Sequence, residues 1–274
     1  MRIAEPIFAP WKAELALGFR YEHDRTVLAE KHFDGPLVVQ KPLYPEGDQV
    51  CHAIVVHPPA GIVGGDQLSV HVSAASRAAV LLTAPGASKW YRSAGPWASQ
   101  TLRFDVAGAL EWLPQETIVF DGGLADMRCE VNLDADATYI GWEILCLGRA
   151  GSGEKFTKGR IELRNTISRN GKPVWRERGA IDAGGGRLMR SPAGLGGKSV
   201  CATLLAAAPQ IDVDVVAACR KVDDVAVTLL PGLLVARHLG GSSEAARQRF
   251  VDLWRILRPV IKGRAAHPPR IWRT

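Results

Sequence analysis

The sequence predicts a mainly β, multi-sheet fold with a few α-helices, most of them in the C-terminal third. In the first two-thirds of the chain, apolar and polar residues alternate with the period of two of half-buried strands. Helical spacing of apolar residues appears only late in the chain. Because many strands precede a few helices, we expect the helices to pack at one end of the sheets. We predict one domain over residues 1–274, β-rich over 1–205 and helix-containing over 206–274.

Three segments in the β-rich part alternate most clearly, at 68–73, 101–106 and 128–133. Each places its apolar side chains on one face and its polar side chains on the other, as expected for a strand that covers a core. The apolar positions are Leu68, Val70, Val72, Leu102, Phe104, Val106, Cys129, Val131 and Leu133. The sequence therefore predicts at least three strands with one buried face. No internal repeat is evident.

Later segments carry turn and helix signals. Asn170-Gly171 separates two strand-like runs and predicts a β-hairpin, and the glycine-rich stretch 183–197 predicts a long irregular loop. Phe250, Leu253, Trp254 and Leu257 have helical spacing, with Ser242 or Ser243 as the N-cap and Pro259 as the end. A shorter helix is expected over Asp214–Lys221.

Composition indicates an ordinary globular protein. The chain has 274 residues, of which 47% are hydrophobic and 23% charged, which suits one large or two small domains. No apolar run is long enough to span a membrane, and Met1–Pro10 shows no signal-peptide core, so we expect a cytoplasmic protein. The five cysteines are widely spaced without a Cys-x-x-Cys pair, which argues against disulfides and structural zinc.

The net charge of +6 does not by itself indicate nucleic-acid binding. The basic residues are dispersed, and no DNA- or RNA-binding signature accompanies them. They are densest in the C-terminal segment, where they form either a solvated helix face or a docking surface for an acidic protein. Gly196-Gly197-Lys198-Ser199 resembles the end of a phosphate-binding loop, but Pro192 stands where that loop needs glycine, so we exclude nucleotide binding there.

The segment His57–Asp66 is the most informative part of the chain. It combines a rigid Pro-Pro entry with several glycines and one carboxylate, which is suited to holding Asp66 in a fixed turn. Three further segments accompany it at 82–93, 110–120 and 141–149. In order and spacing these segments, together with the tail 269–274, resemble the urease accessory protein UreD (UreH) family over about Trp11–Thr274. Two departures are visible, Ala60 in place of glycine and Trp90 in place of phenylalanine.

The resemblance implies an elongated structure similar to a right-handed β-helix, with a small number of helices. It also implies a non-enzymatic role in urease maturation. Members of the family bind apo-urease, the companion protein UreF and, through it, the nickel-carrying GTPase UreG, and we expect a 2:2:2 assembly with UreF and UreG. A water-filled tunnel is proposed to conduct nickel through the family's fold. The implied cargo is transient nickel(II), with no permanently bound cofactor, no nucleic acid and no membrane.

Motif by motif, Asp66, Ser88, Glu143 and Glu177 correspond to polar positions linked to that route. The residues themselves support an unusual environment, because Glu143 interrupts the apolar run 139–147 and Glu116 lies within the run 113–120. A carboxylate in an apolar strand must face solvent, pair with a cation, bind metal or line a wet cavity. A salt bridge to Arg92, Arg149 or Arg178 is the simpler interpretation, whereas weak oxygen ligands would let nickel move on.

We interpret Asp66, Glu143 and Glu177 as transient oxygen ligands and Ser88 as a polar lining group. The helix Ser243–Arg258 and the tail to Thr274 are expected to expose anchors for partner docking. These anchors are Phe250, Trp254, Arg258, Arg270 and Trp272. One alternative is a metal-dependent hydrolase that uses His57, Asp66 and Glu116 around one metal, and another is a pure scaffold without metal.

Overall fold

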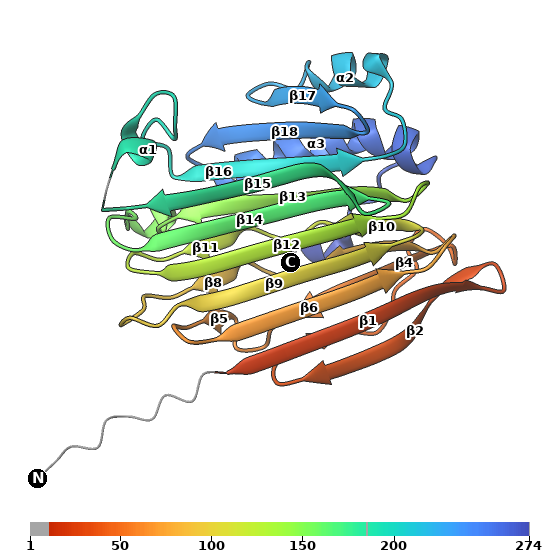
Figure 1. Cartoon of the computed structure of the whole chain (residues 1–274), viewed down its shortest axis with the longest axis horizontal. Helices are drawn as coiled ribbons and strands as arrows, with labels where there is room; N and C mark the ends of the chain where they lie inside the picture. Colours follow the sequence, from red (N-terminus) through yellow and green to blue (C-terminus); the bar gives the residue numbers. More distant parts are fainter. Residues whose placement is uncertain (1–10, 185, 274) are drawn as a thin grey trace, which may run out of the picture.

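Two stacked β-sheets make up the fold, with the longest helix, α3 Ser243–Lys262, behind the second sheet (Figure 1). The computed structural model describes residues 11–184 and 186–273, so the N-terminal segment Met1–Pro10 and the last tail residue, Thr274, lie outside the described residues. Strands make up 48% of the chain and helices 15%, and the longest helix lies near the C-terminus. The expectation of a mainly β fold with a few helices is therefore confirmed.

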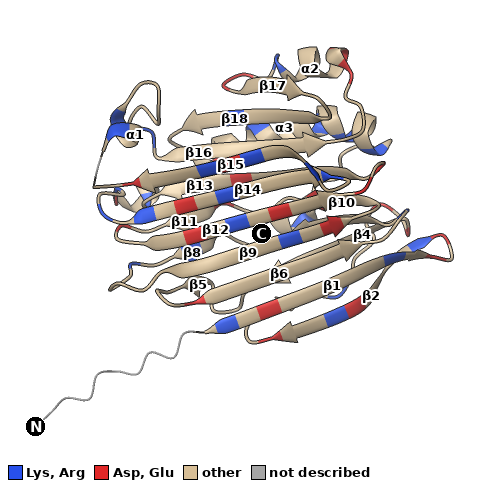
Figure 2. Ribbon diagram, in the orientation of Figure 1, with Lys and Arg blue, Asp and Glu red and all other residues tan. Residues whose placement is uncertain are grey.

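The front sheet in Figure 1 has seven strands in the order β15-β14-β12-β9-β6-β1-β2. Its inner face packs on the second sheet. Charged residues recur along its strands (Figure 2), and in β9 and β12 they occupy the positions that alternate with the buried ones. This is the alternation that the sequence predicted for three of these strands. The strands are β1 Lys12–Glu22, β2 Arg25–Asp34, β6 Gln67–Ala74, β9 Ala98–Val106, β12 Leu124–Leu133, β14 Arg160–Arg169 and β15 Lys172–Asp182.

The second sheet has eleven strands and a buried position between the front sheet and the helices. Its main path runs β17-β18-β16-β13-β10-β7-β4-β3, with β5, β8 and β11 paired beside it. Burial on both faces explains why its central strand reads as a nearly continuous apolar run. The strands are β3 Val38–Val39, β4 Val50–Val56, β5 Gly61–Ile62, β7 Ala79–Thr83, β8 Ser88–Trp90, β10 Ala109–Trp112, β11 Thr117–Val119, β13 Thr138–Leu147, β16 Val200–Ala207, β17 Ala226–Leu230 and β18 Leu233–Gly240.

The middle of the chain coils repeatedly between the two sheets. Each turn of the coil passes from a long strand of the second sheet through a short strand to a strand of the front sheet, as β4-β5-β6, β7-β8-β9 and β10-β11-β12 do. Equivalent strands of successive turns pair in parallel. This is the β-helix-like layout that the resemblance implied. It is also a structural repeat, which residue identities did not reveal because only the pattern of burial recurs.

The Asn170-Gly171 hairpin is confirmed between β14 and β15. Both turn residues have positive φ, 50° for Asn170 and 72° for Gly171, as a two-residue hairpin turn requires. The stretch 183–197 differs from the expected irregular loop, because a short helix, α1 Arg187–Arg190, lies within it. Residues 183–184 and 192–197 of that stretch form turns.

The C-terminal helix is longer than the sequence predicted. Helix α3 spans Ser243–Lys262, starts at the N-cap Ser242 and contains Pro259 in its interior. The expected end at Pro259 is therefore wrong, because tertiary contacts on both sides of the proline outweigh its missing N–H. Beyond the proline, the ammonium of Lys262 donates hydrogen bonds to the hydroxyl and carbonyl oxygens of Thr138 at 2.8 and 3.2 Å. The shorter expected helix is α2, Val213–Cys219.

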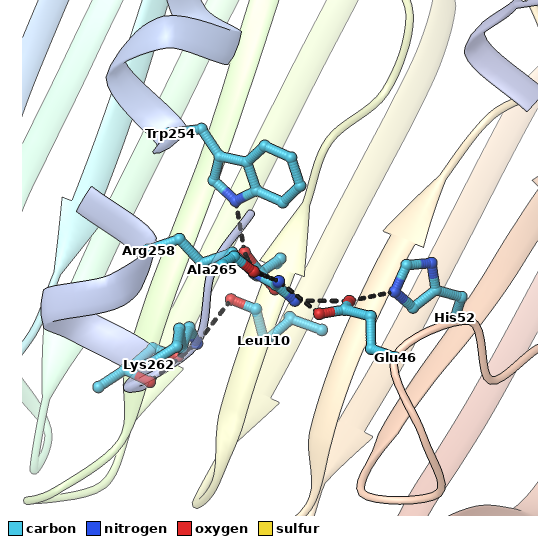
Figure 3. A network of polar contacts seen from close by, with 9 residues as sticks. Glu46, His52, Leu110, Trp254, Arg258, Lys262 and Ala265 are labelled. Atoms are coloured by element: carbon cyan, nitrogen blue, oxygen red, sulfur yellow. Dashed lines mark hydrogen bonds and ion pairs between the residues drawn. The ribbon is translucent and has the colours of Figure 1, made fainter. Parts of the chain in front are cut away.

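A buried ionic network fastens α3 to the second sheet (Figure 3). Its centre is Arg258, with 1% of its side chain exposed, whose guanidinium binds the Glu46 carboxylate at 2.5 and 2.7 Å and the Glu111 carboxylate at 3.1 Å. Trp254 also donates to Glu111, at 2.6 Å, and His52 pairs with Glu46 at 2.6 Å. The two carboxylates thus share the buried Arg258 cation, and each has one further polar partner of its own.

This burial corrects the expectation that the C-terminal anchors are exposed. Phe250, Trp254 and Arg258 are fully buried against the second sheet, so they hold the fold together rather than a partner. Trp272 is half-buried beside Trp254 and donates a hydrogen bond to the Thr83 hydroxyl at 2.8 Å. Arg270 alone among the five is exposed, at the start of the 3₁₀ helix η2, Arg270–Arg273.

In the described part of the chain, no helix is long and apolar enough to cross a membrane.

Candidate functional site

The inner face of β13 brings polar groups into the space between the two sheets. Tyr139, Gly141 and Glu143 alternate along this face, and the opposite face of the strand packs against α3. A Cβ atom on Gly141 would lie 2.0 Å from the Tyr139 hydroxyl oxygen, so glycine is required for the phenol to lie across the strand. Glu143, two residues further, points into a cavity.

This cavity has a volume of about 280 Å³ and lies where successive turns of the coil bend. Most of its wall is apolar, including Leu68, Val70, Leu102 and Trp112. A few polar side chains converge on it, as in sites that bind small ligands or ions. The polar lining groups are His57, Ser88, Gln100, Gln115, Thr117 and Glu143.

Glu143 is the one carboxylate among the residues that line the cavity. One of its carboxylate oxygens, Oε1, is buried without a hydrogen-bond partner among the described residues. Burial raises the pKa of Glu143, and a hydrogen bond from Thr117 offsets this only in part. A carboxylate in such a place gains strongly from a proton or a cation. The expected salt bridge to Arg92 or Arg149 is not formed, since both side chains are exposed elsewhere.

Strand register extends the polar groups beyond the cavity. Ser88 on β8 lies directly opposite Thr117 on β11, and Glu143 lies opposite Thr203 on β16. Thr203 in turn lies opposite Arg237 on β18. Directly paired residues point to the same face of a sheet, so these side chains all face the inter-sheet space.

The row ends at Glu177 in the front sheet. Arg237 donates a hydrogen bond to the Glu177 carboxylate at 2.5 Å, and Asn165 donates a second one at 3.3 Å. The salt bridge expected for Glu177 is therefore present, but its cation is Arg237 instead of Arg178. We call the six residues that face the inter-sheet space in this way the polar row, namely Ser88, Thr117, Glu143, Thr203, Arg237 and Glu177.

Two thiols flank the polar row, and both remain protonated at neutral pH. Burial, with further repulsion from the Glu143 charge, raises the pKa of Cys129 and that of Cys201 to about 12 each. Burial also raises the pKa of Tyr139 well above its usual value, and Tyr139 shares a hydrogen bond with Cys129. The groups beside Glu143 are therefore neutral and do not compensate its charge.

Asp66 does not belong to the polar row. It is buried in the turn between β5 and β6, where its carboxylate accepts hydrogen bonds from the backbone N–H groups of Val63 at 2.9 Å and Trp11 at 3.3 Å. It is not among the residues that line the cavity of Glu143. The structure therefore assigns Asp66 to holding the turn, as the glycine-rich sequence around it suggested.

Replacing Asp66 with alanine is expected to destabilise the fold by about 1–3 kcal/mol, because two backbone N–H groups lose their acceptor. Urea denaturation of the purified chain measures this loss. If the Asp66→Ala protein instead kept full stability and lost only nickel transfer, Asp66 would be a ligand after all.

The residues proposed for a hydrolase do not form one site. His57 lines the cavity on the inner side of the sheet. The negative charge of Glu116, in contrast, contributes to the raised pKa of the Cys146 thiol, which lies in the core beneath α3. Over residues 11–184 and 186–273, no three His, Cys, Asp or Glu side chains are grouped closely enough to hold a metal ion. Burial lowers the pKa of His57, despite the opposing charge of Asp66, so its imidazole is neutral at pH 7.

Three members of the polar row were not predicted from the sequence. Thr117, Thr203 and Arg237 lie in ordinary alternating strands and have no motif of their own. An arginine at an inward position of β18 was the available signal, because the residues two before and four before it, Val235 and Leu233, are core residues. Recognising it required the strand and its inner face to be known first.

Comparison with known proteins shows which family the chain belongs to. The family model described as UreD urease accessory protein matches residues 12–273. The chain belongs to the UreD family. A urease accessory protein UreD from Azoarcus sp. (strain BH72) is 53% identical over 270 residues, covering 96% of this chain and 94% of that protein. The protein of the same name from Dechloromonas aromatica (strain RCB) is 51% identical over 283 residues, covering 99% of this chain and 98% of its own length.

One departure from the family pattern has a visible structural counterpart. Ala60, which stands where the resemblance led us to expect glycine, has a φ of 59°. This left-handed conformation is unfavourable for alanine and readily adopted by glycine. Ala60 in this UreD chain thus occupies a backbone conformation that glycine would adopt without strain.

Proposed function

We propose that this chain conducts nickel(II) to apo-urease during urease maturation, without catalysing a reaction itself. The observation that carries the proposal is the buried, unpartnered carboxylate oxygen of Glu143 in a cavity that Ser88 also lines. A cation that enters the cavity gives this oxygen the partner it lacks among the described residues. Membership of a family named for urease accessory function supports nickel as that cation.

The chemistry of the polar row suits an ion that passes through. Carboxylate and hydroxyl oxygens, with the neutral imidazole of His57 nearby, are acceptable but weak ligands for a divalent transition metal. The thiols of Cys129 and Cys201 would bind nickel tightly as thiolates, but burial raises the pKa of each to about 12, so nickel binding there must first displace a proton at a cost. Weak oxygen sites allow release to urease, whereas thiolate sites would retain the metal.

The partners that we propose are apo-urease, UreF and, through UreF, UreG in a 2:2:2 assembly. Of the residues first expected to dock them, Arg270 is exposed and remains a candidate contact. The inward faces of α3 and η2 are occupied by the core, so docking uses their outward faces. Exposed arginines on these faces suit the rim of an interface with an acidic partner.

The test is to delete the gene in its host and to measure nickel per active site in purified urease. We expect urease in normal amounts but poor in nickel and inactive, since the enzyme is made but not filled. Fully loaded and active urease in the deletion strain would refute the proposal. In the scaffold alternative the chain binds partners without carrying metal. The Glu143→Gln variant distinguishes this alternative from nickel conduction, because a scaffold does not need the carboxylate.

A further inference from the structure

The ion pair between Arg237 and Glu177 bridges the two sheets. Glu177 lies on β15 of the front sheet and Arg237 on β18 of the second sheet, with their charged atoms 2.5 Å apart. Among the ion pairs of residues 11–184 and 186–273, no other joins a strand of one sheet to a strand of the other. It therefore links the two sheets at the Glu177 end of the polar row.

We propose that Arg237 is a competing cation that gates this end of the polar row, so that nickel(II) binds Glu177 only by displacing the guanidinium. The inference rests on the proposed conduit function, and it adds a residue and a mechanism for release. A carboxylate that already pairs with a guanidinium holds a second cation less tightly, because the two positive charges repel each other. Arg237 thereby keeps the Glu177 site weak.

The surroundings of Arg237 allow this exchange. Half of its side chain is exposed, and the guanidinium lies 5.9 Å from the centre of the Trp175 ring. When displaced from Glu177, the guanidinium can enter water or remain over the aromatic face, both of which are acceptable environments. Asn165 stays hydrogen-bonded to Glu177 and keeps the carboxylate oriented.

The two carboxylates of the row therefore face different competitors. Glu143 Oε1 has no hydrogen-bond partner among the described residues, so a metal ion has no fixed positive charge to displace there. Glu177 is already neutralised by Arg237, so an incoming ion must replace a fixed positive charge. A divalent ion gains more from a carboxylate than a monovalent ion does, which favours nickel(II) over sodium or potassium in this exchange.

The test compares nickel(II) binding to the purified full-length chain and its variants by isothermal titration calorimetry, with the metal ion alone as the probe. We expect Arg237→Gln to bind nickel(II) about three- to tenfold more tightly, a moderate factor because the ion pair is half-exposed. The gain in nickel(II) affinity from Arg237→Gln should vanish in the double variant that also carries Glu177→Gln. Comparison of the two single variants with the double variant isolates the coupling between the two residues. If Arg237→Gln does not fold, Arg237→Met retains the stem that packs near Trp175 and serves the same purpose.

Arg103→Gln is the matched control, because Arg103 also pairs with a carboxylate, that of Asp105, but on the outer face of the front sheet. It should leave nickel binding unchanged. If Glu177→Gln weakens nickel binding but Arg237→Gln changes nothing, the gate is refuted and the conduit stands. If Glu177→Gln has no effect on nickel binding or urease activation, Glu177 is not on the nickel route, and the proposed gating by Arg237 is refuted as well.

Discussion

Replacing Arg258 with alanine is expected to destabilise the folded chain by about 3–5 kcal/mol, because it leaves two buried carboxylates without their cation. Glu46 and Glu111 are both buried, and the Arg258 guanidinium contacts each of them as well as the carbonyl oxygen of Ala265. Denaturant unfolding followed by circular dichroism measures the free energy of unfolding.

Arg255→Ala is the matched control on the same helix. The Arg255 side chain is 54% exposed and pairs with Asp252 three residues earlier, so its loss should cost no more than about 0.5 kcal/mol. Equal stability losses for Arg255→Ala and Arg258→Ala would show that the buried network does not hold α3. Loss of partner binding in Arg258→Ala without loss of stability would restore the docking role first expected for Arg258.

The same network has a signature in the pH dependence of stability. Burial alone would raise the pKa of Glu46, but the hydrogen bonds from His52 and Arg258 outweigh it and lower that pKa from 4.5 to about 2. A depressed carboxyl pKa stabilises the fold above pH 4.5, and this contribution is lost as the pH falls toward 2. In Arg258→Ala the acid-sensitive contribution should be smaller, since one source of the depression is gone.

Replacing Glu143 with glutamine is expected to weaken nickel(II) binding to the purified chain by about tenfold or more and to yield nickel-poor urease. The amide keeps the size of the side chain and removes the charge that attracts the ion. Metal analysis of urease matured with the variant gives the nickel content. Glu130→Gln is the control, because Glu130 is an exposed glutamate on the outer face of β12.

Unfolding does not account for such an effect of Glu143→Gln. Burial raises the pKa of Glu143 in the folded chain, so its ionisation opposes folding as the pH rises above 4.5. The glutamine variant should therefore be at least as stable as the natural chain at neutral pH. Normally loaded urease, together with intact partner binding, would remove the conduit role and favour the pure scaffold.

How far the sequence predicted the site depended on whether a residue lies in a motif. Ser88 and Glu143 were identified from their segments, and the structure brings both to one cavity. Asp66 was identified in the same way, yet its carboxylate is used by two backbone N–H groups. A motif marks a residue that the fold needs, and it does not distinguish a ligand from a turn-holding carboxylate.

For the C-terminal helix, the sequence predicted which residues share a face but not what that face contacts. Its apolar spacing placed Phe250 and Trp254 on one face correctly, and burial of that face was not inferred. Pro259 was taken as a helix end because local propensity disfavours proline in a helix. Arg258 binds Glu111 and Lys262 binds Thr138, each more than a hundred positions away, so the local sequence could not predict these contacts.

The sequence by itself determined the mainly β class, three strands with one buried face, the hairpin turn, the presence of α2 and α3 and the family, because alternation, turn chemistry and motif order are local properties. Only the tertiary structure decided which polar residues meet. Glu143, Thr203 and Arg237 form one line because three strands pair in a fixed register, and Glu177 joins them because two sheets stack. Register and stacking follow from burying the whole core at once, so no single segment encodes them.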